Sequence, residues 1–361
     1  MSTLSGLPCL TNDNAHLSCV IVQGMNQHHR HLPTPVLTQS PTHADLPVLP
    51  VGMADKIADL KRASKSVNTQ KAYQSDWRLW QTWCTSNGLV SIPAHPDTVS
   101  AYIADEAPRL KVSTLTRHLA TVSKAHKVAG FPSPCQAVGV QDTLAGLRKT
   151  YGTARKEAPG LLADGLRATL DILGDDLAGH RDRALLLVGW CAGLRRSEIA
   201  DMKWGDLLAD PDGLVIVLRK SKTDQVGAGR QVGLAREADP TICPVSALAG
   251  WRNAVEKLTP GAVEAGAPIF TRVTKWGGQV TGNLSGQAVG FVIERRCRQA
   301  GLVVRYQGHS LRKGLVQQAT MAGVTDSAVM ATTGHQSVAM LRRYQSTAGL
   351  VTRSASRGLL S

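Results

Sequence analysis

The sequence contains no uninterrupted apolar run of about 18 residues, the minimum length for a membrane-spanning helix. Its first residues also lack the basic start and the continuous apolar segment of a secretory signal peptide. The cysteines are scattered, and they form neither a CxxC pair nor a Cys–His cluster at metal-ligand spacing. These absences predict a reduced, cytoplasmic protein with no metal site. The seven cysteines are Cys9, Cys19, Cys84, Cys135, Cys191, Cys243 and Cys297.

Acidic residues are few relative to basic ones. The chain has 41 Lys and Arg against 27 Asp and Glu, which gives a formal charge of +14. The basic residues are spread along the sequence, and this distribution favours a polyanionic partner. A basic protein that is merely soluble is the alternative, and charge alone does not distinguish DNA from RNA.

Residues 1–52 are rich in Pro, Thr, Ser, Asn and His and show no sustained period of 2 or 3.6. We interpret them as a mostly disordered extension. His28, His29 and His31 could hold a metal, but without an acidic or cysteine partner at fixed spacing a solvated polar tail is the better interpretation.

Residues 53–152 have a helical pattern throughout. Tyr73, Trp77, Trp80 and Cys84 recur at spacings of three and four, which places them on one apolar stripe. The segment is therefore predicted to form a small all-helical domain.

A linker at 153–160 precedes a second domain at 161–345, which is also mostly helical. Its exception is the run GLVIVLRKSKTDQVGAGRQVGLA, where a β-branched run, a Gly-rich turn and a second run predict a small hairpin or meander. Residues 346–361 form a tail with a possible short helix.

Four motifs in this second part of the chain carry residue types suited to phosphodiester chemistry. An attacked phosphodiester gathers negative charge on its non-bridging oxygens, and two guanidinium groups can bind those oxygens with charge-assisted hydrogen bonds. Such a clamp can replace a metal ion. A tyrosine, whose pKa is ordinarily near 10, needs this cationic help to act as a nucleophile. The motifs are GLRRSE with Arg195 and Glu198, RKSKT with Lys220 and Lys222, GHSLR with His309 and Arg312, and GHQSVAMLRRY with His335 and Tyr344.

Each motif alone has an ordinary interpretation. An Arg–Glu pair three residues apart is usually a surface ion pair, and a single tyrosine is more often part of a core. The order and joint spacing of all four favour one catalytic site.

The ordered motifs resemble the tyrosine recombinase family of phage integrases, and within it the Cre-like members. The resemblance extends from about residue 60 to 348. It implies a mainly α-helical, two-domain, C-shaped clamp. A helical core-binding domain would precede a mostly helical catalytic domain with a small antiparallel β-sheet.

The resemblance also implies roles for the motif residues. Tyr344 would be the nucleophile that forms a 3′-phosphotyrosyl link, and Lys222 the general acid for the leaving 5′ oxygen, with Lys220 as the nearby alternative. Arg195 and Arg312 would bind the phosphate.

His309 would act as general base or phosphate ligand, and His335 would donate a hydrogen bond to the phosphate. Glu198 would orient the site by bonding His309 or a cationic partner.

DNA contacts are expected by the same resemblance on both domains. In the first domain, Trp77, Trp80 and Trp83 are expected to pack rather than to stack on bases, because duplex DNA exposes no base faces. The expected contact residues are Lys71, Arg117, His118, Arg272 and Lys275.

The implied activity is site-specific recombination of duplex DNA through a Holliday junction, without metal, ATP or any cofactor. A homotetramer on inverted-repeat half-sites is expected, located with the nucleoid of a prokaryote or with a phage. Leu350, Leu359 and Leu360 are candidate anchors for docking the tail in a neighbouring subunit. A relaxing topoisomerase of type IB and a DNA-binding regulator with a degenerate site are the alternatives.

Overall fold

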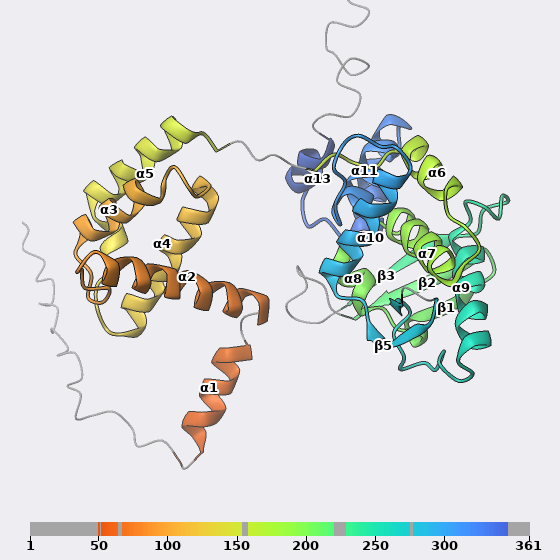
Figure 1. Cartoon of the computed structure of the whole chain (residues 1–361), viewed down its shortest axis with the longest axis horizontal. Helices are drawn as coiled ribbons and strands as arrows, with labels where there is room; N and C mark the ends of the chain where they lie inside the picture. Colours follow the sequence, from red (N-terminus) through yellow and green to blue (C-terminus); the bar gives the residue numbers. More distant parts are fainter. Residues whose placement is uncertain are drawn as a thin grey trace, which may run out of the picture. The chain divides into compact units, whose positions relative to one another are not determined.

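The computed structural model describes residues 50, 52–63, 67–153, 158–219, 229–274 and 277–345. The chain divides into two compact units, Met1–Thr153 and Ala154–Ser361, which we call the N-terminal and C-terminal units (Figure 1). Nearly all of the predicted extension, half of the predicted linker and the whole predicted tail, with its three leucines, lie outside the described residues. No described helix is long and apolar enough to cross a membrane.

The described part of the N-terminal unit is all helical, as the sequence predicts. Helix α2 packs on α4, and α3 packs on α5. Trp80 is fully buried, while Trp77 and Trp83 pack against the same core, so the tryptophan stripe is confirmed as packing. The helices are α1 (Met53–Ala63), α2 (Val67–Ser86), α3 (Pro96–Glu106), α4 (Val112–Val128), the 3-10 turn η2 (Pro134–Gln136) and α5 (Val138–Tyr151).

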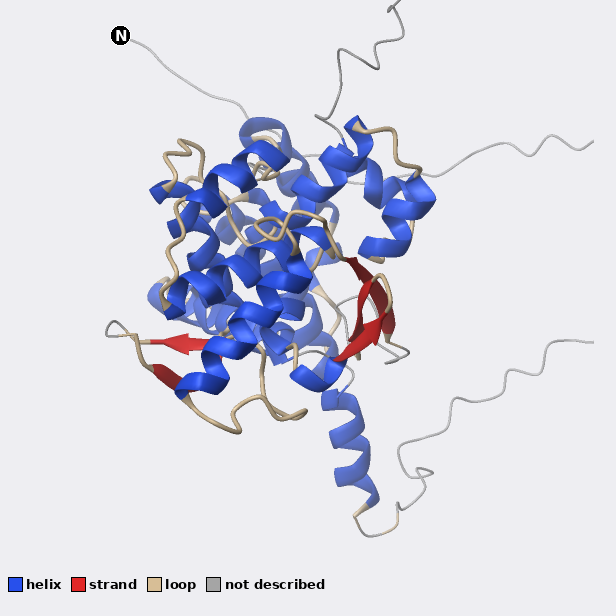
Figure 2. Cartoon of the chain, turned by 90° about the vertical axis from the view of Figure 1, so that its right-hand side faces the viewer, coloured by secondary structure: helices blue, strands red, loops and turns tan. Residues whose placement is uncertain are grey.

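The C-terminal unit is mostly helical and carries two small antiparallel sheets (Figure 2). Its helices are α6 (Ala163–Asp171), α7 (Leu177–Cys191), α8 (Arg196–Asp201), the 3-10 turn η3 (Trp204–Asp206), α9 (Pro244–Leu258), α10 (Gly286–Gln299), α11 (Ser310–Met321), α12 (Asp326–Thr333) and α13 (Val338–Gln345).

The predicted hairpin is present as β2 (Gly213–Leu218) and β3 (Arg230–Ala235), and a preceding strand, β1 (Leu207–Asp210), extends it to a three-stranded meander. A second pair, β4 (Thr271–Val273) and β5 (Gln279–Asn283), was not foreseen in the sequence. The mainly helical fold with a small antiparallel sheet matches the expected fold class.

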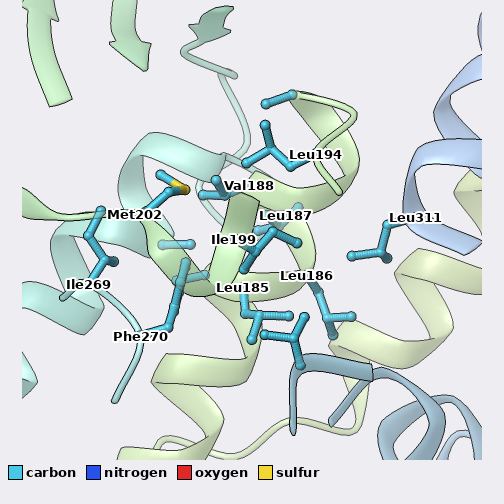
Figure 3. Close-up of a cluster of buried hydrophobic side chains, with 14 of the residues drawn as sticks. Leu185, Leu186, Leu187, Val188, Leu194, Ile199, Met202, Ile269, Phe270 and Leu311 are labelled. Carbon is cyan, nitrogen blue, oxygen red and sulfur yellow. The ribbon is translucent and has the colours of Figure 1, made fainter. Parts of the chain in front are cut away.

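Helix α7 lies at the centre of the C-terminal unit. Four consecutive residues, 185–188, are all buried, which happens only when a helix is covered on every side. Helices α9 and α11 supply much of that cover. The central position of α7 fixes the loop that follows it, which carries Arg195. Figure 3 shows the cluster with Leu185, Leu186, Leu187, Val188, Leu194, Ile199, Met202, Ile269, Phe270 and Leu311.

A second, smaller cluster joins the three C-terminal helices. Val316 of α11, Val329 of α12 and Leu341 of α13 are buried together, and Tyr344 packs against them. This cluster holds the tyrosine-bearing helix on α11.

Candidate active site

The structure brings the residues of three sequence motifs together in the C-terminal unit. They come from the start of α8, the start of α11, the turn after α12, and α13, and three of these helices can be followed in Figure 1. The residues concerned are Arg195, Glu198, His309, Arg312, His335 and Tyr344. Lys220 and Lys222 lie outside the described residues, as does Lys275.

Glu198 is a buried carboxylate in the first turn of α8. Its Oε1 accepts from Arg195 Nη1 at 2.6 Å, and its Oε2 accepts from the backbone N–H of Arg195 at 2.9 Å. The carboxylate of Glu198 thus binds both the side chain and the backbone N–H of Arg195, the residue that precedes the helix. Of the two partners expected for Glu198, the structure shows the cationic one.

Arg312 is fully buried, and the contacts of its two terminal nitrogens fix the orientation of the guanidinium group. Nη1 donates to the carbonyl oxygen of Gly193 at 2.7 Å, and Nη2 lies 3.3 Å from His335 Nε2. Gly193 has φ +57, and a Cβ there would lie 2.9 Å from the side chains of Leu315 and Thr333, so the loop requires glycine. Burial, together with the charge of Arg195, lowers the pKa of Arg312 to about 10, which leaves it cationic at neutral pH.

His335 is buried as a neutral imidazole whose tautomer follows from its neighbours. Thr333 Oγ1 donates its one hydrogen to the carbonyl oxygen of Val329 at 2.6 Å. Because that hydrogen is used, Oγ1 of Thr333 accepts from His335 Nδ1–H at 2.7 Å. Nε2 then carries no hydrogen and accepts from Arg312. Burial and the neighbouring Arg312 lower the pKa of His335 to about 3.

Tyr344 lies between the two histidines of the site. Its hydroxyl is 3.0 Å from His309 Nε2, and its ring centroid is 4.8 Å from that of His335. His309 is exposed and sits at the start of α11, whereas Tyr344 is half-buried. The eight residues between His335 and Tyr344 form one turn and most of α13, and they bring both side chains to the same place.

Arg230 belongs to the site although no sequence motif indicated it. It is the first residue of β3, and its Nη2 donates to Glu198 Oε2 at 3.2 Å. Its Nη1 donates to the carbonyl oxygen of Thr332 at 2.6 Å. The only local signal was an arginine directly after the Gly-rich turn of the predicted hairpin, and that position gives no hint of a partner 32 residues earlier in the chain.

Positive charge exceeds negative charge among the described residues of the site. The site holds three guanidinium groups, from Arg195, Arg230 and Arg312, and one carboxylate, that of Glu198, which pairs with Arg195 and Arg230. His335 is neutral. The surplus of two positive charges in a largely buried place favours an anion there. A phosphodiester approaching a five-coordinate state carries the matching charge on its non-bridging oxygens.

The expected DNA-contact residues fall into different environments. Lys71 on α2 and Arg272 on β4 are exposed, as a phosphate contact requires. Arg117 on α4 is half-exposed, but its Nε and Nη2 bind both oxygens of Asp76 at 2.7 and 2.8 Å.

The prediction that His118 faces DNA is wrong for the conformation in the structure. His118 is 1% exposed, its Nδ1 is 2.6 Å from Tyr102 Oη, and its Nε2 is 3.2 Å from Asp76 Oδ1. It lies on the face of α4 that also carries Leu115 and Leu119, which points into the core. Arg117 is the preceding residue, and because successive residues of a helix point in different directions, it lies at the surface.

Comparison with known proteins agrees with this geometry. Residues 161–349 match the Phage integrase family. The chain is 32% identical to the integrase/recombinase xerD homolog of Selenomonas ruminantium, over 78% of this chain and 82% of that protein. It is 26% identical to recombinase cre of Escherichia phage P1, over 84% and 92% of the two chains. The likeness to Cre is therefore present, at a lower identity than that to the xerD homolog.

Solved structures show the same fold. Lambda integrase bound to DNA superposes with a TM-score of 0.54 at 17% identity, over 84% of this chain and 96% of that one. The Tn1549 transposon integrase in complex with circular intermediate DNA gives a TM-score of 0.53 at 16% identity, over 81% and 92%. Sequence, fold and site agree: the chain belongs to the phage integrase family of tyrosine recombinases.

Proposed function

We propose that this recombinase cleaves and rejoins duplex DNA through a covalent bond between Tyr344 and a 3′ phosphate. The observation that carries the proposal is the 3.0 Å contact between Tyr344 Oη and His309 Nε2, beside a surplus of guanidinium groups. The contact places a proton acceptor on the phenol, and the guanidinium groups supply positive charge where a phosphate would gather negative charge.

The cleavage step proceeds as a substitution at phosphorus. The phenolic proton of Tyr344 passes to His309 Nε2 as the tyrosyl oxygen bonds to phosphorus. The bond from phosphorus to the 5′ oxygen breaks, and Lys222 gives that oxygen a proton. The energy of the broken bond is kept in the phosphotyrosyl link, so a second 5′ hydroxyl can attack it and rejoin the strand without ATP.

Arg195 and Arg312 bind the non-bridging oxygens in this mechanism. For Arg312, the phosphate takes the place that His335 Nε2 holds at Nη2. His335 then donates to the phosphate only after its hydrogen has moved to Nε2 from Nδ1, where the contact with Thr333 favours it.

We further propose a homotetramer that acts on two duplexes with inverted-repeat half-sites and passes through a Holliday junction. Lambda integrase has been solved as a tetramer bound to a Holliday junction, with a TM-score of 0.53 at 17% identity to this chain. XerH has been solved on a palindromic difH substrate in a post-cleavage complex, with a TM-score of 0.53 at 18% identity. The shared fold supports the same assembly here, with the exposed Lys71 and Arg272 as phosphate contacts.

A nicked half-site that releases its short 5′ fragment tests the nucleophile. The wild-type chain should trap a covalent protein–DNA adduct, and Tyr344→Phe should trap none while keeping its affinity for the same DNA. Phenylalanine preserves the packing of the ring against the cluster of Val316, Val329 and Leu341. Adduct formation by Tyr344→Phe would show that another residue attacks.

Tyr306→Phe is the matched control, because this tyrosine is partly buried against the main core of the same unit. It should form the adduct at the wild-type rate. Relaxation of a supercoiled plasmid that lacks matched half-sites, with no strand exchange on a plasmid that has them, would instead indicate a topoisomerase.

A further inference from the structure

Arg230 joins two parts of the site that come from distant segments of the chain. One terminal nitrogen donates to Glu198 on α8, and the other donates to the carbonyl oxygen of Thr332 near the end of α12. Glu198 in turn binds Arg195, and Thr332 lies three residues before His335. The guanidinium of Arg230 therefore connects the arginine at one side of the site to the segment that carries the histidine at the other.

The backbone before His335 packs directly on Arg230. Gly334 has φ +68 and ends α12, and a Cβ there would lie 3.0 Å from both Cδ and Nε of Arg230. Only a residue without a side chain allows this approach in an unstrained backbone. The arginine thus contacts the end of α12 through a hydrogen bond and the following turn through packing.

The contacts of Arg230 argue against a direct role in phosphate binding. Each of its terminal nitrogens already donates to a protein acceptor, and its Nε is buried without a hydrogen-bond partner among the described residues. Burial lowers the pKa of Arg230, which means that the fold keeps this cation in a place where its charge is disfavoured. A cation retained under these conditions is expected to hold structure that the site needs.

We propose that Arg230 is a positioning residue for strand cleavage, which sets the distance between Arg195 and the segment of His335 and Tyr344 by binding Glu198 and Thr332 together. This inference rests on the proposed function, because it concerns the same cleavage step. Both halves of the phosphate site then meet one phosphate only while the Arg230 bridge is present.

Single-turnover cleavage of the nicked half-site tests this role. At saturating DNA, Arg230→Met should form the covalent adduct about 10²-fold more slowly than wild type, because a displacement of about 1 Å costs about that factor. The dissociation constant for DNA should change by less than about threefold, since phosphate contacts outside the site supply most of the affinity. Arg230→Lys should show an intermediate rate, because one ammonium group cannot reach both acceptors in the geometry of a guanidinium.

Arg236→Met is the control, since Arg236 is exposed just beyond the other end of the same strand. It should cleave at the wild-type rate. If Arg230→Met does not fold, as judged by its thermal transition, Arg230→Lys is used in its place. The expected result is the same: slower adduct formation with a nearly unchanged dissociation constant for DNA.

The effect of Arg230 on the cleavage rate should also depend on Glu198. The double variant Glu198→Gln with Arg230→Met should be no slower than the slower single variant, because both changes break one connection. A double variant whose loss equals the product of the two single losses would overturn the proposal, as would a folded Arg230→Met that cleaves within threefold of wild type. Absence of any adduct with the wild-type chain would instead refute the proposed function itself.

Discussion

Each unit of the molecule contains a hydrogen-bonded tyrosine and histidine, and the two pairs have opposite surroundings. In the N-terminal unit, Tyr102 Oη lies 2.6 Å from His118 Nδ1, and both side chains are buried beside Asp76. In the C-terminal unit, Tyr344 Oη lies 3.0 Å from His309 Nε2, with the histidine exposed to solvent. The pairing alone therefore says little about reactivity.

The charges around each pair make the difference. Burial, followed by the carboxylates of Glu106 and Asp76, raises the pKa of Tyr102, so its phenol keeps its proton. Beside Tyr344, three guanidinium groups outnumber the single carboxylate of Glu198 among the described residues. In the proposed mechanism this positive charge stabilises the phosphate that Tyr344 attacks, whereas the charges that raise the pKa of Tyr102 are negative.

Removal of one guanidinium group from the site of Tyr344 and His309 should have the largest effect on the cleavage rate. Arg312→Gln is expected to slow adduct formation at saturating DNA by about 10³-fold, because a preorganised donor to the developing charge is lost. The measurement is single-turnover cleavage of the nicked half-site.

Arg183→Gln is the control for that change, since Arg183 in the same unit donates to the carbonyl oxygens of Leu170 and Leu173. It should reduce thermal stability with little effect on the cleavage rate. An Arg312→Gln variant that cleaves within tenfold of wild type would contradict the surplus-charge explanation.

The pH dependence of stability should reveal the burial of His335 and its cationic surroundings. Its folded-state pKa is about 3, below the unfolded value of about 6.5, so in this window the unfolded chain binds a proton that the folded chain does not. The free energy of unfolding should therefore fall as pH is lowered from about 6.5 toward 3.

His335→Gln should lose stability less steeply over that range, as followed by thermal denaturation at a series of pH values. His118, whose pKa is also lowered by burial, is present in both proteins, so the difference between the two curves isolates His335. Parallel curves for the two proteins would mean that His335 is already charged in the fold.

The smallest effect is expected for the buried pair of the N-terminal unit. Tyr102→Phe leaves His118 Nδ1 without its hydrogen bond and should lower the free energy of unfolding by about 1 kcal/mol. Chemical denaturation measures that loss, and the rate of adduct formation at saturating DNA should stay within about twofold of wild type. A tenfold slower rate in the folded variant would show that the two pairs are functionally linked.

The sequence was sufficient for features that depend on local pattern. The stripe of Trp77 and Trp80 predicted a packed helix, and the β-branched runs around a Gly-rich turn predicted β2 and β3. The spacing of three residues between Arg195 and Glu198 is that of an ordinary ion pair, and the structure shows this pair, although buried rather than at the surface.

The sequence was insufficient where partners come from distant segments or where the phase of a helix decides exposure. Arg230 meets Thr332 across 102 residues, and no spacing encodes that contact. His118 and Arg117 are neighbours in a basic segment, yet one is in the core and the other at the surface. Only the packing of α4 determines which of the two faces outward.

Thr333 allows the buried imidazole of His335 to change its tautomer although the ring cannot turn over. A hydroxyl exchanges donor for acceptor by rotation about a single bond, so Oγ1 can release the carbonyl of Val329 and donate to Nδ1 instead. The ring can then carry its hydrogen on Nε2 without turning over, and Nδ1 keeps Thr333 as its hydrogen-bond partner. Valine would fill the same volume but could neither accept from Nδ1–H nor donate to Nδ1, so it would leave that nitrogen without its partner in both states.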